Sequence, residues 1–355
     1  MSQARQRIRF LRTEDGVRLA WAESGSGPLL VKAANWMSHL ELDWESPVWR
    51  HWIRFFSEHF RYVRYDERGC GLTDWNVSEL SVAQWMNDLE RVIDAARPEG
   101  PFTLLGISQG AAACIAYAVE HPDRVSHMIL YGGYGRGAYQ RGNPEAAREY
   151  GVIADAVRVG WGKENPSFRQ LFTSRFIPDG TAEQLSWLND LCRRTTTGEI
   201  AAELLRMRAT LDVTALLDRV RVPTLVIHAR EDNVVPVGEG RLLASNIPDA
   251  QFVELESKNH VLLEDEPAWP RFREAVLSFV GRPAGAQDEH FAALSPRERE
   301  ILALLTDGLG NADIGERLTI SEKTVRNHLS NIYDKLGVWT RAQAMVFARD
   351  HGFRG

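Results

Sequence analysis

The stretch that most constrains the fold of this chain is Gly106-Ile107-Ser108-Gln109-Gly110, which follows an apolar run at residues 102–105. A helix of small residues is expected directly after it, at residues 111–119. The order predicts a strand, a sharp turn and a helix, with Ser108 at the apex of the turn. The glycines two residues before and two residues after the serine let neighbouring backbone pass close. Such a turn pushes the Ser108 hydroxyl out of the sheet, where it can act as a nucleophile.

Expected strands and helices alternate over the first 280 residues. This alternation predicts a mostly parallel sheet that is covered by helices on both faces. The expected strands lie at residues 8–11, 17–21, 28–32, 62–65, 102–106, 125–131, 222–228 and 251–255, and the expected helices at residues 49–60, 82–96, 111–119 and 269–280.

Residues 132–220 break this alternation, because they are helical in pattern and rich in large apolar residues, with no clear strand. Pockets in open sheets lie beyond the carboxyl ends of the strands, so an insertion here predicts a lid over the active site. The alternative is a plain helical layer whose aromatic residues are core. On the lid interpretation, the expected ligand-pocket residues are Asn35, Met37, Trp161, Phe172 and Phe176.

Two residues later in the sequence can act with Ser108 as a general base and an orienting acid. A serine hydroxyl is a poor nucleophile unless a base removes its proton during attack. His260, in the loop after the last expected strand, would be that base, and Asp232, just past the preceding strand, would hold its imidazole in the right tautomer. Each residue also has a bland explanation: Asp232 could end a strand, with Glu231 competing for its role, and His260 could cap the final helix region. The order serine, acid, histidine, with each residue at a strand end, favours a cluster of the three residues in space, whereas turnover of a substrate stays open.

Residues 8–280 resemble the α/β-hydrolase family. The stretch Asp66-x-Arg68-Gly69-x-Gly71-x-Thr73 is similar to the family's D-x-R-G-x-G-x-S, and the serine turn and the Asp and His loops fall where that family has them. The resemblance implies an α/β-hydrolase fold with a helical lid and a catalytic triad of Ser108, Asp232 and His260.

The oxyanion hole departs from the family pattern. The family commonly follows its third strand with His-Gly, and a backbone N–H just beyond acts with the N–H after the nucleophile. The equivalent stretch here is Ala34-Asn35-Trp36, so the resemblance implies Trp36 and Gln109 as the two donors. Loss of one such donor slows catalysis about 100- to 1000-fold. Slow hydrolysis and binding without turnover therefore both stay open.

The last part of the chain has a purely helical sequence pattern after a segment without apolar periodicity. Residues 282–290 have no apolar periodicity, which is typical of an interdomain linker and predicts domains at residues 1–281 and 291–355. Ser295, Pro296 and Glu298 form a strong helix start, with a cap, a proline at the first position and a capping box. Four helices are expected, at residues 296–306, 311–318, 321–336 and 340–351.

The third of these helices carries an apolar stripe, formed by Val325, Leu329, Ile332 and Leu336, that must face a core. A short helix, a tight turn and a longer helix with a polar outer face form the helix-turn-helix arrangement, whose second helix enters the major groove. The alternative is a small helical bundle with a solvated face, because the charges of this segment nearly cancel.

Candidate DNA contacts follow from this arrangement. Arg326 can read guanine and Asn327 adenine, and Ser330 lies on the same outer face. Phosphate contacts, which position the protein without specifying sequence, are expected from Lys323, Thr324, Lys335 and Arg341.

The segment also resembles the LuxR-type, or GerE-like, helix-turn-helix family over its full length. The matching residues are Leu294-Ser295-x-Arg297-Glu298-x-Glu300-Ile301-Leu302, Asn311-x-x-Ile314-Gly315-x-x-Leu318 and Ser321-x-x-Thr324-Val325-x-x-His328-Leu329-x-Asn331-Ile332-Tyr333-x-Lys335-Leu336. The resemblance implies binding to double-stranded DNA at a pseudo-palindromic operator. The fourth helix commonly forms the dimer contact in that family, so a homodimer with residues 341–351 near the two-fold axis is implied.

Composition adds limits rather than a function. The net charge of −6 shows no global positive charge, so any binding of nucleic acid must be local. Cys70, Cys114 and Cys192 are widely spaced and form no metal or disulfide pattern, which suits a reducing cytosol. No apolar run approaches the length of a membrane span. We expect a cytoplasmic protein without membrane contact, cofactor or metal.

Two functions remain open. The first is a transcription regulator whose hydrolase-like domain binds, and in a hybrid form hydrolyses, a small, largely apolar ester- or lactone-type ligand that controls DNA binding. The second is an active esterase, thioesterase or lactonase with an appended DNA-binding domain. The regulator ranks first, because a DNA-binding module would serve little in a purely metabolic esterase.

Overall fold

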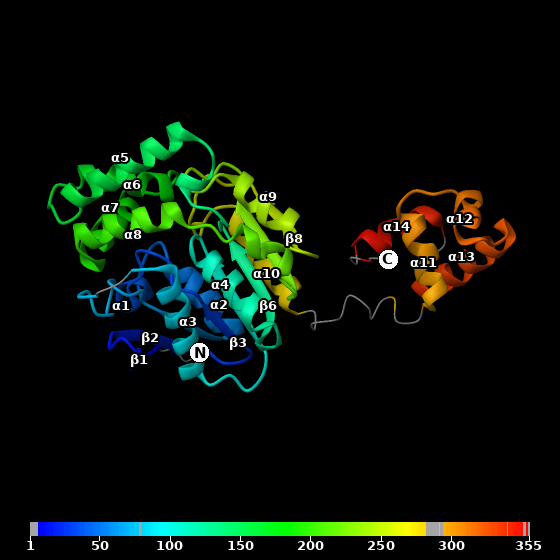
Figure 1. Cartoon of the computed structure of the whole chain (residues 1–355), viewed down its shortest axis with the longest axis horizontal. Helices are drawn as coiled ribbons and strands as arrows, with labels where there is room; N and C mark the ends of the chain where they lie inside the picture. Colours follow the sequence, from blue (N-terminus) through cyan, green and yellow to red (C-terminus); the bar gives the residue numbers. More distant parts are fainter. Residues whose placement is uncertain are drawn as a thin grey trace. The chain divides into compact units, whose positions relative to one another are not determined.

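The structure, a computed structural model, describes residues 6–77, 80–281, 291, 294–338, 340–350 and 353 of the chain. The chain divides into two compact units, Met1–Val280 and Gly281–Gly355 (Figure 1). The expected linker at residues 282–290 lies outside the described residues, so its role stays a prediction. Among the described residues, no helix is long and apolar enough to cross a membrane.

An eight-stranded sheet forms the centre of the first unit, in the order β1-β2-β4-β3-β5-β6-β7-β8. β2 is antiparallel to both of its neighbours, and all other neighbouring pairs are parallel. The strands β3, β5 and β7 are buried along their whole length, which explains their continuous apolar runs. The eight predicted strands are confirmed: β1 (Arg7–Arg12), β2 (Arg18–Ser24), β3 (Leu29–Lys32), β4 (Arg61–Tyr65), β5 (Phe102–Ile107), β6 (Val125–Tyr131), β7 (Thr224–Ala229) and β8 (Gln251–Leu255).

Six α-helices of this unit lie outside the 132–220 segment. α2 and α10 pack together through Trp52 and Phe272, whose rings also contact Tyr131 of β6. Short α1 and glycine-containing α9 were not predicted. Gly240 sits in α9 because a Cβ there would lie 2.4 Å from Nδ1 of His228 on β7. The helices are α1 (Leu40–Trp44), α2 (Arg50–His59), α3 (Val82–Ala96), α4 (Gly110–Glu120), α9 (Val237–Asn246) and α10 (Ala268–Val280), with a short turn η1 (Pro122–Arg124).

The segment between β6 and β7 is helical, as predicted. Figure 1 shows its four helices, in green, as a group apart from the helices that pack along the sheet. Its only pairing of extended backbone is an isolated bridge between Arg136 and Asp212. The elements are η2 (Ala138–Gln140), α5 (Pro144–Gly160), α6 (Ser167–Phe176), α7 (Ala182–Thr195), α8 (Gly198–Thr210) and η3 (Thr214–Arg219).

A buried ion-pair network holds the loop after β4. Arg68 is fully buried and donates from Nε and Nη2 to the two carboxylate oxygens of Asp88 on α3, at 2.7 Å each. Its Nη1 is 2.8 Å from Asp15 Oδ2 in the β1–β2 turn. One guanidinium thus ties three segments that are far apart in the sequence, and its planar donors match the carboxylate geometry.

The second unit is a four-helix domain with its own core. Ile301, Leu305, Ile314, Val325 and Ile332 are each fully buried in it. The four helices agree with the prediction, although the last begins at Arg341, one residue later than expected. They are α11 (Pro296–Thr306), α12 (Asn311–Leu318), α13 (Glu322–Leu336) and α14 (Arg341–Asp350).

The predicted start of α11 is confirmed. Ser295 accepts from the backbone N–H of Glu298, and the Glu298 carboxylate accepts from the Ser295 N–H, which completes the capping box. Thr319, in the left-handed region at a φ of 55°, ends α12. Ser321 then caps α13, so that a tight turn joins these two helices.

Replacement of Asp88 by Ala is expected to lower the free energy of unfolding by about 3–5 kcal/mol, because it removes the buried carboxylate that pairs with the buried Arg68 guanidinium. Asp94 provides a matched control on the same helix, since its side chain is 53% exposed and pairs with Arg124 at the surface. Asp94→Ala is expected to cost about 1 kcal/mol or less. Denaturant unfolding followed by tryptophan fluorescence measures both, because every tryptophan except Trp339 lies in the first unit. Equal losses for the two variants would contradict the stated role of Arg68.

Candidate active site and DNA-binding surface

The turn around Ser108 has the strained geometry of a nucleophile elbow. Ser108 follows β5 with a φ of +54°. Residues other than glycine rarely adopt this backbone conformation, and those that do are often found at functional sites. A Cβ on Gly106 would lie 2.7 Å from Ala111 Cα, and a Cβ on Gly110 would lie 3.2 Å from the Ala34 carbonyl oxygen. The two glycines therefore let the strand, α4 and the loop after β3 meet at the serine.

Asp232 and His260 are hydrogen-bonded to each other. His260 Nδ1 is 2.6 Å from Asp232 Oδ2, and both side chains are almost completely buried. The other carboxylate oxygen, Oδ1, accepts from the backbone N–H groups of Val234 and Val235, at 2.7 and 2.9 Å. Glu231, the alternative acid considered from the sequence, is exposed. The loop after β7 therefore directs Asp232, and not Glu231, at the histidine.

The surroundings keep Asp232 ionised. Burial acts to raise its pKa, but His260 and the hydrogen bonds that the carboxylate accepts hold its pKa below the usual value of 3.8. A charged carboxylate at Nδ1 fixes the tautomer in which Nε2 can take a proton. Gly132 makes room for the pair: its φ is +54°, and a Cβ there would lie 3.1 Å from His260 Cε1.

Ser108 and His260 line the same cavity. His260 Nε2 is buried and bonds to no partner among the described residues, so the serine–histidine hydrogen bond is not formed in this state. Catalytic hydrogen bonds are often long without substrate and tighten in the complex. The structure thus brings together Ser108, His260 and Asp232, the three residues predicted from the sequence as nucleophile, base and orienting acid.

The cavity has a volume of about 70 Å³ and is covered by α5, α6, α7 and α8, each of which contributes lining residues. Among the five expected pocket residues, Asn35, Met37, Phe172 and Phe176 line it. Trp161 does not: it is fully buried and its ring stacks on Trp36, with the centroids 5.3 Å apart. A size-based prediction could not tell a wall residue from the aromatic residue that packs behind the wall.

The two backbone donors expected for an oxyanion hole lie in the loop after β3, at Trp36, and directly after Ser108, at Gln109. The backbone N–H groups of Trp36 and Gln109 donate to no acceptor among the described residues. Two side-chain hydrogen bonds hold the loop after β3. Lys32 Nζ donates to Asn35 Oδ1, and Asn35 Nδ2 donates to the Trp36 carbonyl at 3.3 Å. Asn35 thus connects Lys32, at the end of β3, to the backbone of Trp36.

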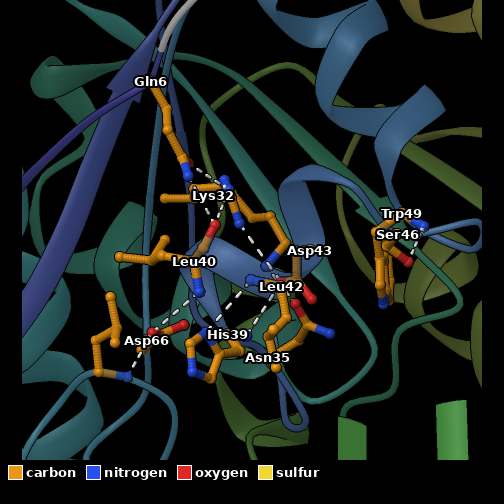
Figure 2. Close-up of polar contacts among 12 residues, drawn as sticks. Gln6, Lys32, Asn35, His39, Leu40, Leu42, Asp43, Ser46, Trp49 and Asp66 are labelled. Atoms are coloured by element: carbon orange, nitrogen blue, oxygen red, sulfur yellow. Dashed lines mark hydrogen bonds and ion pairs between the residues drawn. The ribbon is translucent and has the colours of Figure 1, made fainter. Parts of the chain in front are cut away.

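Lys32 belongs to a buried polar cluster that sequence reasoning missed (Figure 2). Arg64 Nη1 lies 3.4 Å from Asp43 Oδ2, and Asp66 Oδ2 accepts from the backbone N–H groups of Leu40 and Leu72. Burial lowers the pKa of Lys32 to about 8 and raises the pKa of Asp43 to about 7. A lysine at the end of an apolar strand was the signal that could have pointed to this cluster.

Arginines of the cavity wall were also missed. Arg141, Arg175 and Arg208 line the cavity, and the described lining residues include no Asp or Glu. All three arise from the helical segment between β6 and β7, where no motif or spacing marks them.

In the second unit, α13 presents the expected polar face. Lys323, Arg326, Asn327 and Ser330 are exposed, opposite the buried stripe of the helix. Within the described part of the chain, Arg326 makes one polar side-chain contact, from Nη1 to the exposed Glu322 Oε1 at 3.3 Å. This guanidinium can leave its intrahelical partner for a base edge at little cost.

The other expected contacts carry structural bonds. Lys335 Nζ donates to the Glu298 carboxylate at 2.7 Å, and Arg341 donates to Asn311 Oδ1 and to the Leu309 carbonyl. Thr324 lies within hydrogen-bond distance of the Ser321 hydroxyl in the cap of α13. Phosphate contacts of these residues stay a prediction.

Comparison with known proteins decides the family. Residues 52–267, more than half of the chain, match the family described as serine aminopeptidase, S33. The chain belongs to this hydrolase family. Residues 292–348 match the bacterial regulatory proteins of the luxR family, so the hydrolase unit is fused to a LuxR-type DNA-binding unit.

Relatives and solved structures agree with both assignments. The hydrolase unit is similar to 3-oxoadipate enol-lactonase 2 of Acinetobacter baylyi, with 26% identity over 65% of this chain and 83% of that protein. The transcriptional regulatory protein DegU of Brevibacillus brevis shares 53% identity over 41% of this chain and 69% of its own length. A hydrolase from Pseudomonas aeruginosa superposes with a TM-score of 0.63 and 25% identity, over 77% of this chain and 98% of its own.

Proposed function

We propose that this hydrolase–LuxR fusion is a transcription regulator whose cavity binds a small ester- or lactone-type signal, and that occupancy of the cavity sets the affinity for DNA. The observation that carries the proposal is that His260, paired with Asp232, lines one cavity with Ser108, in a chain that also holds a DNA-binding unit. In a chain with both units, ligand binding in the hydrolase unit can regulate DNA binding by the other unit. The cavity that would hold the signal is lined mostly by apolar and aromatic side chains.

The triad supports acylation by the signal. Ser108 Oγ attacks the carbonyl carbon while His260 Nε2 takes the hydroxyl proton, and Asp232 stabilises the resulting imidazolium. The N–H groups of Trp36 and Gln109 bind the oxyanion. Collapse of the tetrahedral intermediate breaks the C–O bond, and His260 returns the proton to the leaving alcohol. Water then repeats the sequence on the acyl-enzyme and releases the acid.

A serine hydrolase with an appended DNA-binding unit is the second candidate. The specific observation in its favour is the Asp232–His260 hydrogen bond at the cavity that Ser108 lines, because a pure receptor would not need a nucleophile, an oriented base and a buried acid together. The two candidates share the acylation chemistry. They differ in whether DNA affinity responds to the cavity.

DNA recognition is proposed to use a homodimer on a pseudo-palindromic operator. The exposed face of α13 enters the major groove, with Arg326 and Asn327 on base edges and Lys323 on phosphate. The fourth helix, α14, lies next to the two-fold axis, in keeping with its place in the family. Two copies of α13 then meet successive half-sites on one face of the duplex.

Ser108→Ala is expected to abolish covalent labelling by a fluorophosphonate probe, whereas the wild-type chain takes up one equivalent. The reason is that the probe reacts with a serine that a base activates. Intact mass spectrometry measures the added group. Ser245→Ala, at an exposed serine of α9, serves as the matched control and is expected to label like the wild type. Persistent labelling of Ser108→Ala would refute the assignment of the nucleophile.

Arg326→Ala is expected to cost about 1–3 kcal/mol on the cognate operator and to relax specificity at one base position, because a bidentate contact to guanine is lost. Lys323→Ala is the comparison, since loss of a phosphate contact weakens binding to all sequences about equally. Fluorescence anisotropy on the operator and on random DNA measures both. An equal loss on both DNAs for Arg326→Ala would make Arg326 a phosphate contact.

A further inference from the structure

Arg208 brings a buried cation to the cavity wall. It comes from α8, lines the cavity that contains Ser108 and His260, and is only 3% exposed. Its Cζ lies 5.0 Å from the ring centroid of Trp36 and 5.4 Å from that of Trp85. Contacts with two indole rings hold the guanidinium in place through cation–π interactions.

The donors of this guanidinium are incompletely used. Nη2 donates to Glu67 Oε2, but Nε and Nη1 are buried and donate to no acceptor among the described residues. A buried N–H without an acceptor costs free energy, and such groups in a native structure call for an explanation. An anionic partner that enters the cavity from the side of Ser108 would use them.

The charges around the cavity favour an anion as well. Arg141 Nε is 3.8 Å from Glu239 Oε1, but the same carboxylate lies 3.1 Å from Arg136 Nε, so two arginines share one acid. Arg175 donates to the Asn233 carbonyl and pairs with no carboxylate among the described residues. The wall therefore carries an excess of positive charge in a confined space, where such charge acts strongly.

We infer that the cavity takes a ligand with a carboxylate at one end, bound by Arg208, and an ester or lactone carbonyl at the other end, held at Ser108. The second half of this statement rests on the proposed function, whereas the carboxylate subsite does not. A carboxylate suits this subsite because a planar guanidinium matches a planar acceptor. Apolar residues such as Met37, Phe172 and Leu205 line the space for a short connecting chain.

A purely structural role makes a different prediction. The Glu67–Arg208 pair also ties α8 to the loop after β4, so loss of either side chain alone could disturb the lid. Removal of one partner of a buried pair is costly, whereas neutral replacement of both partners costs much less. The double variant Glu67→Gln/Arg208→Gln therefore removes the cation while it limits damage to the fold.

The test measures binding in a Ser108→Ala background, so that no ligand is consumed. The probes are the monomethyl esters of succinate, glutarate, adipate and suberate, which carry one carboxylate, and the matching dimethyl esters, which carry none. Isothermal titration calorimetry gives the affinity ratio of each anionic ester over its neutral counterpart. The neutral ester also reports whether the cavity of each variant is intact.

We expect at least one monoester to bind about 10- to 100-fold more tightly than its dimethyl ester. Glu67→Gln, which keeps the cation, is expected to retain this preference, and Glu67→Gln/Arg208→Gln is expected to lose it. Arg175→Gln, at a half-exposed position, is expected to reduce it less. Absence of any anionic preference in the Ser108→Ala protein would overturn the inference, as would an unchanged preference in the double variant.

Failure of the inference and failure of the proposed function are distinguishable. Fluorophosphonate labelling of Ser108 without an anionic preference would refute the carboxylate subsite alone. An anionic preference that the double variant loses, in a chain that the fluorophosphonate does not label, would refute the acylation chemistry alone.

Discussion

The left-handed backbone of Ser108 at the end of β5 is the constraint on which the hydrolase unit depends. A φ of +54° holds the hydroxyl above the sheet only because Gly106 and Gly110 let α4 and the loop after β3 approach without a clash. The same edge of the parallel sheet delivers the loops of Asp232 and His260, since the carboxyl ends of parallel strands meet there. The strained turn thus places Ser108 at the sheet edge to which two other strands bring Asp232 and His260.

Much of this fold could be predicted from local sequence patterns. The strands were predictable because buried parallel strands are continuous apolar runs, and the caps at Ser295 and Ser321 because capping chemistry is local. The DNA-binding unit was equally accessible, since a short helix, a turn and a striped helix have a fixed spacing. The sequence left Asp232 and Glu231 as alternative partners of the histidine, and the loop conformation distinguishes them. The Asp232 carboxylate accepts from two backbone N–H groups, whereas Glu231 is exposed to solvent.

Long-range packing explains what sequence could not give. Trp161 and Phe172 are both large aromatic residues of the lid segment, yet one stacks behind Trp36 and the other lines the cavity. Arg208 meets Glu67 and two tryptophans from different parts of the chain, so no spacing marks it. The sequence does not predict α9, because glycine is a poor helix former. Gly240 occurs in this helix because a larger residue would clash with His228. Each of these depends on which surfaces meet after folding.

The central claim is that the cavity of the hydrolase unit controls the LuxR-type unit. The most direct measurement is the affinity of the full chain for an operator, selected from a random DNA pool, before and after stoichiometric modification of Ser108 by a fluorophosphonate, with Ser108→Ala treated in parallel. The account predicts a change of about 5- to 150-fold in the modified wild type, the usual range for coupled sites, and none in the variant. An affinity that stays the same after complete modification of Ser108 would contradict it.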